Sequence, residues 1–364
     1  MNDNNATDDT FESCAVILKR LKQTKKQDLN GDDNLVLEKC EDFIAGKFDA
    51  AEFNEFCRKL APSPPQTQRR QPNYKLLAQR LNNGEIALCL GPELPALFDP
   101  KLQPAVKLVE QFAAIAKYAY AGRPALSEVC EYAELNRDEC TRSDIVAELK
   151  KLSSPPSHAA PNRTLYDLLC RLEKPFLAID SGFDNLLRQH LRKNGRKFVS
   201  IVPLPGEEPA QAQAPQKLML HYSDREAAEC SDEQLSALRL MDKDYILIYH
   251  PRGYLEGPED TLLLAERDYF NAAYLLDKKY PAYLHNKLKG RNCGLWFLGY
   301  APDSWEARLL AKVLLHQRRD HSDPALVIQP AADAFSNLFW RHLKCDQYAD
   351  LGAVEFVDNI RAAL

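Results

Sequence analysis

The sequence lacks any long apolar run and any strong excess of one charge. No stretch approaches the roughly 18 uninterrupted apolar residues that a membrane-spanning helix requires, and the acidic start MNDNNATDDT is unlike a secretory signal. Lysine and arginine number 47 against 52 aspartate and glutamate residues, which gives a formal net charge of -5. We therefore expect neither nucleic acid nor a membrane as partner, and we expect a cytoplasmic protein.

The ten cysteines show no pairing that would indicate a metal site or a redox motif. They form no CxxC pair and no cysteine–histidine spacing typical of zinc. They are instead scattered through segments predicted to be helices or strands, and cysteine is often buried as a small hydrophobe. We expect reduced, mostly buried cysteines and no bound metal.

Residues 1–60 are predicted to form a small helical domain. Apolar residues recur at helical spacing within 11–21, 37–44 and 53–60. The segment 61–73, APSPPQTQRRQPN, has almost no apolar content and is predicted to be a linker. Because about sixty residues bury little surface alone, we expect this domain to act as an adaptor for a protein partner or to pack against the larger domain. A homo-oligomer is a further alternative.

Residues 74–364 are predicted to form an α/β domain with a Rossmann-like, doubly wound, mostly parallel sheet. Short apolar runs alternate with helical patterns, and such runs suit strands that are covered on both faces. A helical insertion is expected at about 101–172, and the proline-rich segment VPLPGEEPAQAQAPQK is predicted to be a surface loop. The predicted strands are 86–90, 175–180, 197–202, 217–222, 244–250, 294–300, 325–330 and 353–357.

Four segments of this domain resemble, in order, motifs of the prokaryotic sirtuin-like family, in the branch known from antiphage and other conflict systems. The family motifs are a GAGxS-type turn, TTNYD, YHLHG followed by SLVLTxxDY, and LFLGYSLxD. The helical segment LSEVCEYAELNRDECTRSDIVAELKKL also resembles the family's insertion. The corresponding segments are LCLGPEL (88–94), PFLAIDSGFDNLL (175–187), YHPRG (249–253) with TLLLAERDY (261–269), and LWFLGYAPDSW (295–305).

The resemblance implies a crevice that binds NAD, and in many members an enzyme that cleaves the nicotinamide–ribose bond. NAD or ADP-ribose is therefore the cofactor that it implies for this chain. The positions that the resemblance places beside this cofactor are Gly91, Gly182, Asp184, Gly253 and Gly299.

The chain departs from the family in three of the motifs that the chemistry needs. In the first turn Pro92 offers no N–H and Glu93 adds a negative charge, although a phosphate loop needs glycines that aim N–H groups at the anion. Gly182 stands where the family has the asparagine that positions a water or a ribose hydroxyl. Arg252 stands where the family has its catalytic histidine, and a guanidinium with a pKa above about 12 is no base near neutral pH.

Two hypotheses follow for the function. The first is a non-catalytic sirtuin-like protein that acts as scaffold, adaptor or nucleotide sensor in a prokaryotic defence system. The alternative is an active NAD hydrolase with a shifted site, in which His250 is the base and Asp180 or Asp184 positions water. Against that alternative, His250 is also interpreted as an ordinary histidine at a strand end, and Asp184 as a residue that holds a strand-to-helix turn.

Overall fold

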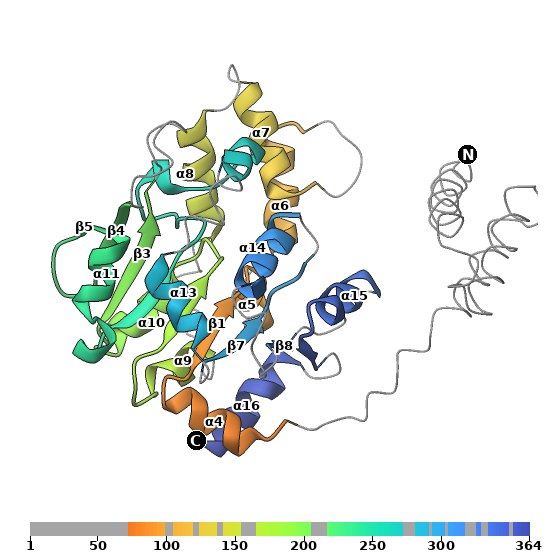
Figure 1. Cartoon of the computed structure of the whole chain (residues 1–364). Coiled ribbons are helices and arrows are strands. Elements are labelled where there is room, and N and C mark those ends of the chain that lie inside the picture. The colour runs from red at the N-terminus through yellow and green to blue at the C-terminus, as the bar shows by residue number, and fades with distance from the viewer. Residues whose placement is uncertain are drawn as a thin grey trace, which may run out of the picture. The chain divides into compact units, whose positions relative to one another are not determined.

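The computed structural model describes most of the chain that follows the predicted linker (Figure 1). All described residues except Pro72 belong to the unit Asn73–Leu364. The predicted helical domain at 1–60 and most of the predicted surface loop lie outside the described residues. The described ranges are 72–98, 105–118, 124–136, 141–153, 165–204, 217–271, 281–290, 293–302, 305–316, 325–328, 334–348 and 352–364.

Within these ranges the strands form one sheet in the order β5-β4-β3-β6-β2-β1-β7-β8-β9. All neighbours pair in parallel except β3 with β4 and β4 with β5. This confirms the predicted Rossmann-like, mostly parallel sheet. The strands are β1 (Ile86–Leu90), β2 (Leu177–Asp180), β3 (Phe198–Pro203), β4 (Lys217–Tyr222), β5 (Ala228–Ser231), β6 (Ile246–Tyr249), β7 (Gly294–Leu298), β8 (Leu326–Ile328) and β9 (Asp346–Gln347).

Helices cover both faces of the sheet (Figure 1). Strand side chains alternate between the faces, so that Ala87 and Cys89 join one buried cluster while Leu88 and Leu90 join the other. The central strands are therefore buried throughout, which explains their continuous apolar character. One face carries α11 (Asp232–Leu238), α13 (Ala282–Lys289), α14 (Trp305–His316) and α15 (Ala334–His342), and the other carries α4 (Tyr74–Asn82), α9 (Leu165–Cys170), α10 (Leu186–Lys193) and α16 (Ala353–Ala363).

Part of the predicted insertion forms a third core of its own. The helices α6 (Ala105–Ile115), α7 (Leu126–Leu135) and α8 (Arg142–Ser153) group together at one end of the sheet (Figure 1) and pack on the segment 255–265. Polar contacts tie them to the sheet domain. Ser127 of α7 donates a hydrogen bond to Glu306 of α14, and Arg142 of α8 bonds the Leu262 carbonyl at 2.6 Å and Asp268 at 3.0 Å.

The fold corrects one predicted strand and adds two short strands that were not predicted. The predicted strand 353–357 is wrong, because it is the start of α16; its buried residues Ala353, Phe356, Val357 and Ile360 fall at helical spacing, and a five-residue apolar window does not separate the two cases. The predicted strand 217–222 is confirmed as β4, and it pairs antiparallel with β3 and β5 inside the mostly parallel sheet. The short strands β5 and β9 were not predicted, since neither has an apolar run.

The described cysteines match their prediction. Six of the ten lie in the described ranges, and all six are buried and form no disulfide with one another. They are Cys89, Cys130, Cys170, Cys230, Cys293 and Cys345. None of the described helices is long and apolar enough to span a membrane.

Gly299 and Gly195 offer a matched test of how tightly the turn after β7 is packed. Both have positive φ, +62° and +64°, but a Cβ on Gly299 would lie 2.7 Å from the backbone of Leu94, whereas one on Gly195 would meet nothing within 4 Å. We expect Gly195→Ala to lower the free energy of unfolding by about 1 kcal/mol, from backbone strain alone. Gly299→Ala adds an overpacking cost of roughly 1–3 kcal/mol.

Chemical denaturation followed by tryptophan fluorescence measures both variants, since Trp296 and Trp340 are buried in this domain. Equal losses of stability in the two variants would contradict the tight packing at Gly299.

Candidate functional site

The candidate site lies where the parallel strands β1, β2, β6 and β7 end. Their carboxyl ends share one edge of the sheet, so that Gly91, Asp180, His250 and Gly299 come to the same side. The chain moves from β1 to β2 on one side and later returns to place β7 on the other side of β1. That reversal is a topological switch point, the place where open α/β sheets bind ligands.

The backbone N–H groups of the turn after β1 donate hydrogen bonds to the end of β7 and within the turn itself. The N–H of Gly91 donates to the Leu298 carbonyl at 2.9 Å, that of Glu93 to the Gly299 carbonyl at 3.3 Å, and that of Leu94 to the Gly91 carbonyl at 3.1 Å. The two prolines of the turn have no N–H to offer. Across residues 91–95, all of them described, every backbone donor is therefore committed within the protein.

The two turns at the switch point also touch each other. A Cβ on Gly91 would lie 1.9 Å from the Gly299 carbonyl oxygen and 2.5 Å from the Tyr300 Cα, so only glycine fits at position 91. The helix that follows, α5 (Leu94–Phe98), has five residues, and its short length gives it little dipole. The residues present therefore do not fit the phosphates of NAD as a glycine-rich loop does.

Two carboxylates flank Gly182 beside β2. The N–H of Gly182 donates to Asp180 Oδ1 at 3.0 Å, and a Cβ on Gly182 would lie 3.0 Å from Asp184 Oδ2 and 3.2 Å from Asp180 Oδ1. Asp184 Oδ1 accepts from the Leu186 N–H at 2.9 Å, at the start of α10. Asp184 thus holds the strand-to-helix turn, and glycine at 182 leaves room for both carboxylates.

These carboxylates bind protons more readily than ordinary ones. Burial and the neighbouring Asp184 charge raise the pKa of Asp180 well above its usual value, against the opposing effects of the Gly182 N–H, Arg188 and Arg252. Burial likewise raises the pKa of Asp184, and the Leu186 N–H and Arg188 oppose that shift. The pair is best described as one coupled unit that retains protons to higher pH.

Arg188 of α10 lies in a cluster with Asn185, Tyr254 and Glu256, which was not predicted from the sequence. Its side chain is 7% exposed, forms a 3.0 Å ion pair with Glu256, and lies 4.0 Å over the Tyr254 ring. Asn185 also donates to Glu256. A buried cation requires a partner, and Arg188 of α10 finds its partners Tyr254 and Glu256 in the loop after β6. These contacts therefore hold that loop against α10.

Arg252, which the resemblance aligns with the family's histidine, is held by aromatic rings. Its guanidinium lies 4.3 Å from the centre of the Phe183 ring, and its backbone carbonyl accepts from the Leu263 N–H at 3.0 Å. Gly253 next to it has φ +70°, and a Cβ there would lie 2.6 Å from the Thr261 carbonyl oxygen. Arg252 is thus a fixed cation near the carboxylate pair.

His250 is fully buried, with 0% of its surface exposed. Its Nε2 lies 3.3 Å from Ser200 Oγ, and its ring packs 4.6 Å from that of Tyr254; Nδ1 has no hydrogen-bond partner among the described residues. Burial, then Arg188 and His221, lower its pKa well below the usual value. Protonation would turn the His250 ring into a buried cation beside Arg188, which is unfavourable. His250 is therefore poorly placed to act as a base.

One comparison with known proteins bears on this arrangement. Residues 177–347 match the model of the SIR2-like domain. The matched range starts at the first residue of β2 and ends at the last residue of β9, which supports a sirtuin-like domain. No curated protein matches the chain.

The SIR2-like range contains the third and fourth segments that carry the resemblance and the second from residue 177 on, and it includes Gly182, Arg252 and Gly299. The β1 turn with Gly91 lies before it.

The structure brings the predicted positions together, and it adds others. Gly91 and Gly299 touch, Gly182 lies between Asp180 and Asp184, and Gly253 sits in the adjoining loop. The described side chains contain no group of three histidines, cysteines, aspartates or glutamates suited to a metal. The cluster residues that sequence reasoning missed are Arg188, Ser200, His221, Tyr254 and Glu256.

The buried His250 makes stability depend on pH. Below about pH 6.5 His250 takes up a proton in the unfolded chain but stays neutral in the folded protein. The free energy of unfolding therefore falls as the pH is lowered. The groups that face it are Arg188, Ser200, His221 and Tyr254. We expect His250 to account for about 1.4 kcal/mol of the stability lost between about pH 7.5 and about pH 5.5.

Urea denaturation at the two pH values tests this in His250→Gln and in a control, His316→Gln, at an exposed position of α14. The first variant should lose less stability on acidification than the parent protein, and the control should lose the same amount. An unchanged pH dependence in His250→Gln would refute the assignment.

Proposed function

We propose that this protein is a non-catalytic SIR2-like protein that works by binding, as a scaffold or adaptor, and does not cleave NAD. The observation that carries the proposal is the β1 turn, whose N–H groups at Gly91, Glu93 and Leu94 all donate within the protein. Arg252 in place of a histidine base supports it, because a guanidinium does not accept a proton near neutral pH. The resemblance to conflict-system proteins suggests a role in prokaryotic defence, with residues 1–60 as the adaptor part.

A second candidate has one specific observation in its favour. The coupled carboxylates Asp180 and Asp184 have raised pKa values at the carboxyl edge of the sheet, and strongly shifted groups in such places are typical of active sites. This arrangement would suit an NAD hydrolase with a shifted site. Against it, no hydrogen bond among the described residues joins His250 to either carboxylate, and its ring is fully buried.

A turnover assay separates the two candidates. Full-length protein is incubated with NAD, alone and with any partner captured through residues 1–60, and nicotinamide and ADP-ribose are quantified by chromatography. We expect no product above the buffer control, and no difference between the parent protein, His250→Ala and Asp180→Asn. Turnover that is lost in His250→Ala would overturn the proposal in favour of the hydrolase.

A further inference from the structure

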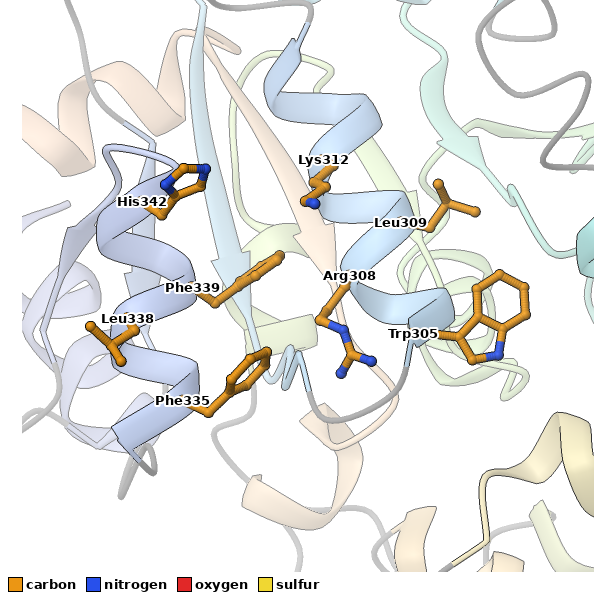
Figure 2. A pocket seen from close by; sticks show the side chains of 8 residues that line it. All are labelled: Trp305, Arg308, Leu309, Lys312, Phe335, Leu338, Phe339 and His342. Carbon is orange, nitrogen blue, oxygen red and sulfur yellow. The ribbon is translucent and has the colours of Figure 1, made fainter. Parts of the chain in front are cut away.

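Two neighbouring helices on one face of the domain, α14 and α15, border an open groove. Figure 2 shows Phe335 and Phe339 of α15 facing Arg308 and Lys312 of α14. The hollow has a volume of about 560 Å³, enough for several side chains of a partner. Its lining residues are Trp305, Arg308, Leu309, Lys312, Phe335, Leu338, Phe339 and His342.

Large apolar side chains are exposed along this groove. Phe335 is 55% exposed and Leu338 is 54% exposed. Phe270, 62% exposed, stacks on Trp305 with ring centres 5.2 Å apart and extends the apolar surface beyond α14. Single exposed apolar residues are ordinary, but a contiguous group rimmed by polar residues is typical of a protein-binding surface.

The charged side chains that line the groove are cationic, although the whole chain carries a net charge of -5. Arg308, which also donates to the Pro302 carbonyl at 3.1 Å, and Lys312 supply this charge, and none of the eight lining residues is acidic. Helix α15 contains no acidic residue, and the one in α14, Glu306, is buried and bonded to Ser127. An acidic partner would therefore meet no opposing carboxylate from these two helices.

The shape favours an extended partner over a small molecule. Helices α14 and α15 have twelve and nine residues, so the groove runs for about 14–18 Å, or roughly three turns of a docked helix. Its aromatic and cationic side chains are spread along both helices rather than converging on one point. A helix lying in a groove binds through apolar residues at i, i+3, i+4 and i+7, with its charged residues toward the rim.

We propose that the groove between α14 and α15 binds an acidic amphipathic helix of a partner protein. Phe335, Leu338 and Phe339 receive its apolar face, and Arg308 and Lys312 attract its carboxylates. The inference deepens the proposed binding role and rests on it. The two are separable, because peptide binding is measured without NAD and turnover is measured without peptide.

The test uses the full-length protein and a labelled amphipathic helix of about 16 residues, with leucine and phenylalanine on one stripe and glutamate elsewhere. Binding is followed by fluorescence anisotropy and by the emission of Trp305, which is partly exposed while Trp296 and Trp340 are buried. We expect saturable binding that weakens with added salt. A second peptide with lysine in place of glutamate should not bind.

Matched double variants locate the surface. Leu338→Ser with Lys312→Glu should weaken binding about tenfold or more, since both an apolar contact and a charge attraction are lost. The control carries the same two changes on α4, Leu76→Ser with Lys75→Glu, on the opposite face of the sheet, where Leu76 is 49% exposed. This control should bind like the parent protein.

Three results would overturn the inference: no binding of the acidic peptide, equal binding of the lysine peptide, or equal weakening by the α4 control. Sedimentation of the protein alone checks the other occupant, a second copy. Self-association that is lost in Leu338→Ser with Lys312→Glu would assign the groove to a homo-oligomer instead. If the peptide binds as expected while NAD is cleaved, the groove stands and the non-catalytic function fails.

Discussion

The contact between the turns after β1 and β7 is the constraint on which the site depends. Gly91 and Gly299 meet backbone to backbone at the switch point of the sheet. Because the N–H of Gly91 donates to the Leu298 carbonyl and that of Glu93 to the Gly299 carbonyl, this contact is also a hydrogen-bonded one. The same glycine that would let a phosphate approach the backbone here lets a neighbouring strand approach it.

The remainder of the carboxyl edge is consistent with that arrangement. Arg188, Tyr254 and Glu256 fix the loop after β6 against α10, and Arg252 stacks on Phe183. Charges that an enzyme would direct at a substrate are here opposed by charges of the protein itself, as Asp180 is by Arg188 and Arg252. The range that matches the SIR2-like model keeps its α/β architecture, while Asp180, Asp184, Arg188 and Glu256 contact groups of the protein itself.

The sequence predicted the central strands well, because strands buried on both faces have continuous apolar runs. It failed where that signal is absent or ambiguous: β5 and β9 are short and polar, and the start of α16 reads as a strand over five residues. The site positions came from the motifs, but Arg188 and Ser200 did not. The signal that could have identified them is a polar residue inside an apolar pattern. Ser200 interrupts the apolar run KFVSIV, and Arg188 lies between Leu187 and Leu191 in LLRQHL. Such a residue marks a polar cluster within the buried face that its neighbours form.

The most direct test of the account is a calorimetric titration of the full-length protein with NAD and, separately, with ADP-ribose. A turn that holds itself and offers no donor predicts no saturable heat with either ligand up to about millimolar concentration, where the binding free energy is only about 4 kcal/mol. Saturable binding of either ligand at one site, with a dissociation constant well below about 1 mM, would contradict the claim that the β1 turn has lost its hold on phosphate.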